Sequence, residues 1–123
     1  MNAHVATLWA NALRSGKYRQ GYSDLRSPDG TYCALGVLAD IYINNHPNTF
    51  AWKLTGSKLT TLPRYYALAN QGQVIRYVDL PEQIATWANL SAGDRGNIIE
   101  LNDVLKMPFT KIADHINSLP QTK

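Results

Sequence analysis

Residues 31–43 read TYCALGVLADIYI, and this stretch decides how the rest of the chain is arranged. Apart from Thr31, Gly36 and Asp40, every residue in it is apolar, aromatic or a thiol. A helix with so little polar surface is buried nearly all round, and these thirteen residues are too few to cross a bilayer. The stretch therefore predicts the central helix of a small soluble core. A glycine inside a helix costs about 1 kcal/mol relative to alanine, so Gly36 predicts that another segment approaches the backbone closely.

The flanking segments predict further helices and a sheet. Apolar residues recur at helical spacing in 3–15 and again from Pro108 to 119, and Pro81 suits the first position of a helix that runs to about Leu90. Short aromatic and β-branched runs at 50–54, 65–68 and 74–78 are typical of strands. The segment 91–97, SAGDRGN, reads as a turn-rich connection. We predict one α+β domain over 1–123, with about four helices packed around the buried helix 31–43 and a small antiparallel sheet within 50–79.

Composition and charge limit the functions that the chain can have. The 123 residues are 45% hydrophobic and 17% charged, as in an ordinary globular domain. The net charge is +3, and residues 41–78 carry four basic and no acidic side chains, which favours a phosphate or an acidic partner. This charge is small for a nucleic-acid-binding protein, and no nucleic-acid recognition motif or membrane span is present. A single cysteine excludes an internal disulfide, and the N-terminus lacks a secretory pattern, so we expect a cytoplasmic protein.

The loop 17–30, KYRQGYSDLRSPDG, is the leading candidate for a binding site. It interleaves aromatic and basic side chains, a combination that stacks on bases and contacts phosphate. The alternative is that its tyrosines pack over the central helix with their hydroxyl groups in water. Asp40 lies in an otherwise apolar helix, so we expect it to accept hydrogen bonds or to face an arginine at 14, 19 or 26. Asn102 and Asp103 suit either a ligand or an Asx turn.

Catalytic and metal-binding patterns are weak. Cys33 is the one potential thiol nucleophile, but it would need a depressed pKa and a histidine nearby. The histidines at 4, 46 and 115 have no metal-ligand spacing, and no glycine-rich phosphate loop is present. We therefore predict no catalytic residues, no metal and no cofactor. A small hydrolase or transferase that uses Cys33 or a His–Asp pair is an alternative.

Four motifs of the chain resemble those of a group of uncharacterised small proteins common in bacteriophage and prophage genomes. WANALRSGKYRQG at 9–21 is similar to their W-x-x-ALRSG-x-Y-x-Q-G, and YCALGVLAD at 32–40 is similar to their YCCLGVLCD. LPEQIATWANL at 80–90 resembles their LP-x-x-V-x-x-W-x-x-L, and LND at 101–103 followed by FTKIADHI at 109–116 resembles their LND with F-x-x-IAD-x-I. Ala34 and Ala39 stand where relatives often carry cysteine, which weakens a shared thiol or metal chemistry.

The resemblance implies a small accessory protein in the cytoplasm of a bacterial host. Such proteins often counter host defence, by sequestering a nucleotide signal or by binding a defence protein. Our leading hypothesis is a non-enzymatic protein that sequesters a small phosphorylated nucleotide, such as a cyclic signal of host immunity. The alternative is a protein-binding inhibitor of a host defence enzyme, and homo-oligomerisation stays open in either case. The predicted ligand-binding residues carry aromatic rings, positive charge or polar side chains: Tyr18, Arg19, Gln20, Tyr22, Arg26, Tyr32, Arg76, Asn102 and Asp103.

Overall fold

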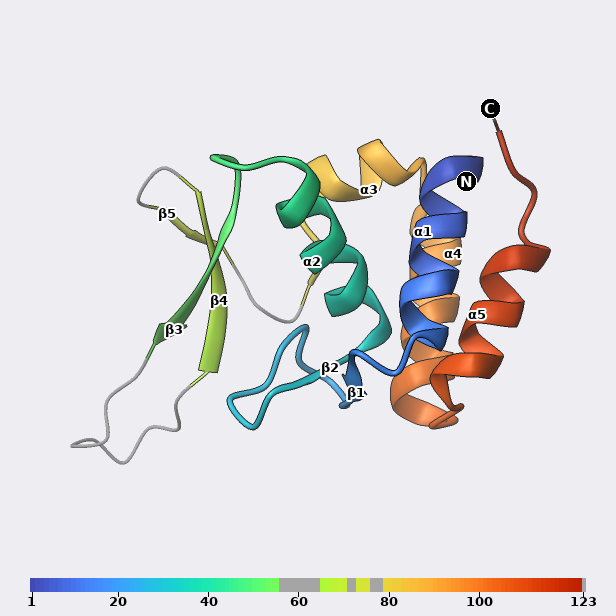
Figure 1. Ribbon diagram of the computed structural model, residues 1–123, viewed down its shortest axis with the longest axis horizontal. Helices are drawn as coiled ribbons and strands as arrows, with labels where there is room; N and C mark the ends of the chain where they lie inside the picture. The colour runs from blue at the N-terminus through green and yellow to red at the C-terminus, as the bar shows by residue number, and fades with distance from the viewer. Residues whose placement is uncertain (56–64, 71–72, 76–78, 123) are drawn as a thin grey trace.

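A computed structural model describes residues 1–55, 65–70, 73–75 and 79–122 of the chain (Figure 1). Within these residues there are five α-helices, one π-helical turn, a two-stranded sheet and a three-stranded sheet. The elements in chain order are α1 (Ala3–Arg14), β1 (Arg19–Gln20), β2 (Thr31–Tyr32), α2 (Ala34–Asn45), β3 (Ala51–Thr55), β4 (Tyr65–Asn70), β5 (Gln73–Ile75), α3 (Glu82–Ala88), α4 (Ala92–Ile99), the π-helical turn η1 (Glu100–Val104) and α5 (Phe109–Ser118). This arrangement confirms the predicted α+β fold.

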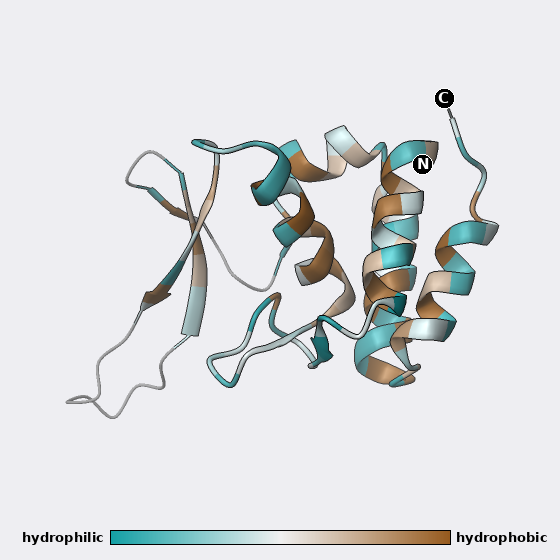
Figure 2. Cartoon of the chain, viewed as in Figure 1, coloured by the Kyte–Doolittle hydropathy of each residue, from teal (hydrophilic) through white to brown (hydrophobic). Residues whose placement is uncertain are grey.

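Helix α2 lies in the middle of the molecule. In Figure 1 the sheet of β3, β4 and β5 stands on one side of it, and α1, α4 and α5 stand on the other. Hydrophobic residues cover most of α2, whereas α1 and α5 also carry hydrophilic residues (Figure 2). Eight of the twelve residues of α2 are buried. The fully buried Trp9 of α1 donates a hydrogen bond from its indole Nε1 to the carbonyl oxygen of Ala34, at 2.9 Å. The prediction of a central buried helix is therefore confirmed.

The central helix begins later than the sequence pattern indicated. Thr31 and Tyr32 form strand β2, which pairs in parallel with β1, and Cys33 is the N-cap residue of α2. The carbonyl of Tyr32 accepts a hydrogen bond from the amide of Gly21 at 2.7 Å. Tyr32 therefore pairs with the preceding loop and is not part of the helix. At the other end the helix continues to Asn45.

Gly36 allows the preceding loop to pass directly over α2. A Cβ atom built on Gly36 would lie 1.7 Å from the carbonyl oxygen of Leu25. The Leu25 side chain is itself fully buried. The predicted close approach of another segment to Gly36 is therefore confirmed.

The three-stranded sheet is antiparallel, in the order β3-β4-β5. Trp52 lies opposite Leu68, and Leu54 lies opposite Tyr66, so these four side chains share one face of the sheet. Leu68 belongs to the hydrophobic core and Trp52 packs against it. Strands β3 and β4 confirm the predicted strands near 50–54 and 65–68, while the third predicted strand extends to residues 76–78, which lie outside the described residues.

One segment predicted as a connection is a helix. Residues 92–99 form α4, with Ser91 as N-cap. The Ser91 Oγ accepts a hydrogen bond from the amide of Asp94 at 3.1 Å, and Asp94 places a carboxylate in the first turn, where the helix dipole favours it. Burial of Ile98 anchors the helix despite its two glycines. Among the described residues, no helix combines the length and apolar character that crossing a membrane requires.

Candidate functional site

Backbone hydrogen bonds hold the loop between α1 and α2 in shape. Gln20 of β1 lies opposite Tyr32 of β2. The amide of Gly21 donates to the Tyr32 carbonyl at 2.7 Å, and the amide of Cys33 donates to the Leu25 carbonyl at 3.3 Å. The loop therefore presents its aromatic and basic side chains from a fixed backbone.

Four aromatic side chains meet where this loop reaches the three-stranded sheet. Tyr18 and Tyr32 come from the loop, Trp52 from β3 and Tyr66 from β4. The ring centroids of Tyr18 and Tyr32 are 5.0 Å apart, those of Tyr32 and Trp52 are 6.1 Å apart, and those of Trp52 and Tyr66 are 6.5 Å apart. All three contacts are edge-to-face, a favourable arrangement for aromatic pairs. We call these four residues the aromatic cluster; each of them keeps part of its surface in solvent.

The Arg26 guanidinium lies over the aromatic cluster. Its central carbon is 4.1 Å from the Tyr66 ring centroid, 5.3 Å from that of Tyr32 and 5.7 Å from that of Trp52. These distances are typical of cation–π contacts. Arg26 forms neither of the two ion pairs found among the described residues, and its buried Nε has no hydrogen-bond partner. The site therefore holds a positive charge that no carboxylate of the described residues neutralises by direct contact.

Asp40 fixes two rings of the aromatic cluster to α2. One carboxylate oxygen accepts a hydrogen bond from the Tyr18 hydroxyl, and the other accepts one from the indole Nε1 of Trp52 at 2.9 Å. Burial and the hydrogen bond to Asp40 raise the pKa of Tyr18, so its hydroxyl stays protonated as a donor. The prediction that Asp40 accepts hydrogen bonds is confirmed. The alternative, that it pairs with an arginine, is not observed among the described residues. Arg14 instead pairs with Asp114 on α5.

Asn102 ties the loop to the N-terminus of α2. It is 1% exposed and lies in η1, a π-helical turn of a kind often found at functional sites. Its Oδ1 accepts hydrogen bonds from Gln20 Nε2 at 3.1 Å and from the amide of Ala34 at 3.2 Å. Its Nδ2 donates to the Gly21 carbonyl at 3.0 Å and to Asp103 Oδ1 at 2.7 Å. Protein groups thus occupy both polar atoms of Asn102.

The structure therefore divides the predicted site residues into separate groups. Tyr18, Arg26 and Tyr32 meet in and over the aromatic cluster, whereas Gln20, Asn102 and Asp103 form a hydrogen-bond network that positions the loop. In that network Asp103 also accepts a hydrogen bond from the amide of Ser23 at 2.9 Å. Two further predicted residues, Arg19 and Tyr22, belong to neither group.

Three of the predicted ligand-binding residues remain: Tyr22, Arg19 and Arg76. Tyr22 is exposed, with the Lys106 ammonium 3.9 Å from its ring centroid. Arg19 donates from Nη2 to the Asp29 carbonyl at 3.0 Å. Arg76 lies outside the described residues.

The sequence interpretation missed Trp52 and Tyr66 as site residues. Both lie in predicted strands, but the ligand-binding prediction used the loop and took from the sheet segment only Arg76. On β3, Trp52 and Leu54 alternate with residues of the opposite face, and on β4 Tyr66 and Leu68 do the same. Each aromatic residue therefore lies on the same face as a leucine. That alternation was the available signal, although the strand register was needed to place the two rings together.

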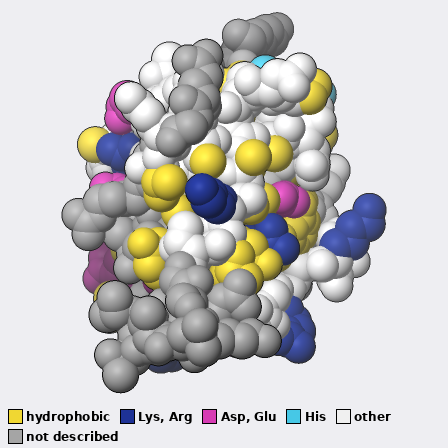
Figure 3. Space-filling model, turned by 90° about the vertical axis from the view of Figure 1, so that its left-hand side faces the viewer, with side chains coloured by type: hydrophobic (Ala, Val, Ile, Leu, Met, Phe, Trp, Pro, Cys, Tyr) yellow, Lys and Arg dark blue, Asp and Glu magenta, His cyan; other side chains and the backbone are white. Residues whose placement is uncertain are grey.

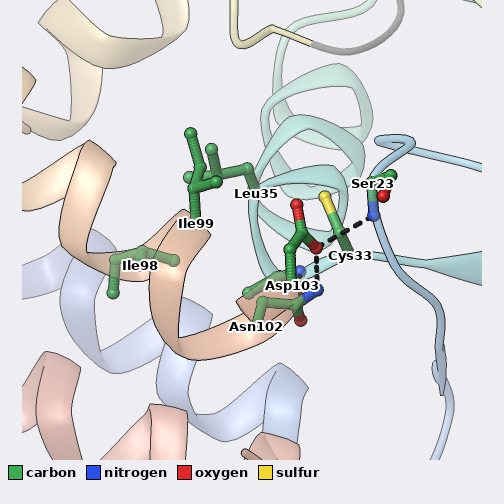
Figure 4. A pocket seen from close by; sticks show the side chains of 8 residues that line it. Ser23, Cys33, Leu35, Ile98, Ile99, Asn102 and Asp103 are labelled. Carbon is green, nitrogen blue, oxygen red and sulfur yellow. Dashed lines mark hydrogen bonds between the residues drawn. The ribbon is translucent and has the colours of Figure 1, made fainter. Parts of the chain in front are cut away.

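A small cavity lies beside the Asn102 network (Figure 4). It measures about 20 Å³, which is room for one water molecule, and is too small for a substrate. Cys33 lines it together with Ser23, Asn102 and Asp103. Burial raises the pKa of the Cys33 thiol to about 12, which is opposite to the shift that a nucleophilic cysteine needs. Among the described residues, no three His, Cys, Asp or Glu side chains are grouped to hold a metal ion.

We expect Cys33 to be inert towards thiol reagents in the folded protein. At pH 8 the thiol is protonated and only 6% of the residue is exposed. Reaction with a chromogenic disulfide should therefore be slower than in 6 M guanidinium chloride by about a hundredfold or more, because both the thiolate fraction and the access of the reagent are lower in the folded protein. The unfolded chain ionises near the ordinary value of 9.0, so the free energy of unfolding should fall as the pH rises from there towards 12. In Cys33→Ala this contribution should be absent. Native Cys33 reacting as fast as the unfolded chain would contradict the assignment.

The fold and the site define a small α+β domain with an arginine held over an aromatic surface. The chain belongs to the family described as a domain of unknown function (DUF8296), which it matches over residues 1–119. Neither the curated proteins nor the solved structures include a significant match.

Proposed function

We propose that this protein is a non-catalytic binding protein that captures a small phosphorylated nucleotide at Arg26 and the aromatic cluster. The observation that carries the proposal is the Arg26 guanidinium, which lies 4.1 Å from the Tyr66 ring centroid and is paired to no carboxylate of the described part of the chain. A guanidinium offers a planar set of N–H donors that matches the oxygens of a phosphate. The contact with the Tyr66 ring holds that group in place before a ligand arrives, which reduces the entropy lost on binding.

The aromatic cluster supplies the second half of the recognition. Its four rings are partly exposed, and Asp40 fixes two of them through Tyr18 and Trp52. A base that stacks on such a ring contributes about 1–3 kcal/mol to binding. Phosphate at Arg26 and a base on the rings together account for an affinity for nucleotides without any catalytic group.

We place this activity in counter-defence, in the cytoplasm of a bacterial host. The support is the resemblance of four sequence motifs to small phage and prophage proteins. A protein that binds a nucleotide without altering it lowers the free concentration of that nucleotide. Sequestration of a cyclic nucleotide signal of host immunity is the role that this chemistry fits.

A thermal-shift screen against linear and cyclic mono-, di- and trinucleotides tests the proposal. A ligand that binds only the folded state adds RT ln(1 + [L]/Kd) to its stability, about 2.7 kcal/mol at a hundredfold excess over Kd. We expect one nucleotide class to raise the melting temperature of the wild type. Arg26→Gln should lose most of this shift. Arg14→Gln should keep it, because Arg14 lies in an exposed ion pair with Asp114. A flat screen would contradict the proposal.

The second candidate function is inhibition of a host defence enzyme by direct binding. Two exposed apolar side chains of the η1 region favour it: Val104 is 69% and Leu105 is 57% exposed. On the side of the molecule seen in Figure 3, hydrophobic side chains also surround a basic one. Exposed apolar patches of this kind often mark protein interfaces. Loss of partner capture in Val104→Ser/Leu105→Ser, with nucleotide shifts absent, would favour this candidate over sequestration.

A further inference from the structure

We infer that Tyr32, Trp52 and Tyr66 form a cage for an organic cation, which Arg26 fills in this structure and which a quaternary ammonium group of a ligand enters when the Arg26 side chain moves out. The inference goes beyond the proposed function, because it assigns a ligand to the three rings themselves. Cation binding needs the rings and not the guanidinium, so it is tested separately from nucleotide binding.

Three aromatic rings converge on one point of the site. The central guanidinium carbon of Arg26 lies 4.1 Å from the Tyr66 ring centroid, 5.3 Å from that of Tyr32 and 5.7 Å from that of Trp52. A cation centred at this point is within about 6 Å of all three centroids, the range in which an aromatic ring attracts a positive charge. The ring of Trp52 meets those of Tyr32 and Tyr66 edge-to-face, so the three rings support one another.

Asp40 makes the cage more favourable for a cation. One of its carboxylate oxygens accepts a hydrogen bond from the indole Nε1 of Trp52 at 2.9 Å. Burial raises the pKa of Tyr32 and the negative charge of Asp40 raises it further, while Arg26 lowers it, so both charges act on that ring. When Arg26 leaves, the charge of Asp40 remains and attracts a replacement cation.

Arg26 is an imperfect occupant of the cage. Its Nε is buried and has no hydrogen-bond partner, and a buried donor left unpaired carries a free-energy penalty. A quaternary ammonium group has no N–H, so it keeps the positive charge and avoids this penalty. Arg26 and the three rings are only partly buried, which gives the arginine side chain a way out and a ligand a way in.

Titrations with choline and with its neutral isostere 3,3-dimethylbutan-1-ol, at constant ionic strength, test this inference. The two molecules have nearly the same shape and differ in charge, and the Trp52 indole N–H signal in ¹H–¹⁵N spectra reports on the cage. In the wild type we expect choline to shift this signal saturably and the alcohol to bind about tenfold more weakly or not at all. A peptide that carries trimethyl-lysine, titrated in parallel, distinguishes a protein side chain from a small molecule as the source of the cation. An equal response to choline and the alcohol, or no response to any of the three compounds, would overturn the inference.

Arg26→Ala should have opposite effects on the two ligands of the site. It removes the tethered competitor, so we expect choline to bind about tenfold more tightly than in the wild type, whereas nucleotide binding should be lost. Tyr66→Leu should weaken choline binding to the wild type by about fivefold or more. Tyr22→Leu is its control, because the Tyr22 ring contacts Lys106 outside the aromatic cluster. Choline binding confined to Arg26→Ala would overturn the inference, since no ligand would then displace the arginine, and the wild-type titrations decide the matter even if a variant does not fold.

Discussion

Gly36→Ala should destabilise the protein by about 3 kcal/mol, although alanine is the better helix former. The new Cβ would lie 1.7 Å from the carbonyl oxygen of Leu25, 2.5 Å from its carbonyl carbon and 3.0 Å from its Cα. These are backbone atoms, so no side-chain rotation relieves the overlap. The loop would have to move away from α2, breaking the packing of the fully buried Leu25 and the hydrogen bond from Cys33 to Leu25. Urea unfolding followed by circular dichroism measures the change.

Gly96→Ala is the matched control. Gly96 also lies inside a helix, α4, and a Cβ atom built on it meets nothing within 4 Å. Helix propensity should then act alone, and the variant should be more stable by up to about 1 kcal/mol. Equal effects of the two substitutions would contradict the close approach of the loop to α2.

Asn102→Ala should cost about 3 kcal/mol of stability, because it leaves two buried backbone groups without partners. The amide of Ala34 loses its bond to Asn102 Oδ1, and the carbonyl of Gly21 loses its bond to Nδ2. An unpaired buried backbone group costs about 1–3 kcal/mol. The loop should also become looser, so we expect nucleotide affinity to fall even though Asn102 is not part of the aromatic cluster.

Asn97→Ala serves as the control for this change. Asn97 is exposed on α4, the helix next to η1, and the same substitution there should alter stability by less than about 0.5 kcal/mol. Chemical unfolding of the three proteins under identical conditions gives the comparison. If Asn102→Ala were as mild as Asn97→Ala, the network could not be what holds the loop.

The sequence alone was sufficient to predict the helical framework. Helices α1 and α5 were identified by apolar residues at regular helical spacing, and α2 by its almost complete lack of polar residues. It was not sufficient for α4. The glycines at 93 and 96 weaken any local helical signal, whereas the helix depends on the Ser91 cap and on burial of Ile98 in the tertiary structure.

The candidate site was predictable only in part, because it is assembled from segments distant in sequence. The aromatic and basic residues of the loop were visible as a local pattern, and Tyr18, Arg26 and Tyr32 do meet. Trp52 and Tyr66 join them through strand pairing, which composition does not reveal. Asn102 has a role that depends on its burial beside the α2 N-terminus, and an Asn-Asp dipeptide in a sequence carries no sign of that environment.

The indole N–H signals of the three tryptophans test the location of the proposed site most directly. Trp9 is fully buried and bonded to Ala34, Trp52 belongs to the aromatic cluster, and Trp87 packs against Tyr42. In ¹H–¹⁵N spectra recorded during titration with a nucleotide that raises the melting temperature of the wild type, the Trp52 signal should shift progressively while those of Trp9 and Trp87 stay in place. Saturable binding that leaves the Trp52 signal unmoved, or shifts Trp87 instead, would contradict a nucleotide site at Arg26 and the aromatic cluster.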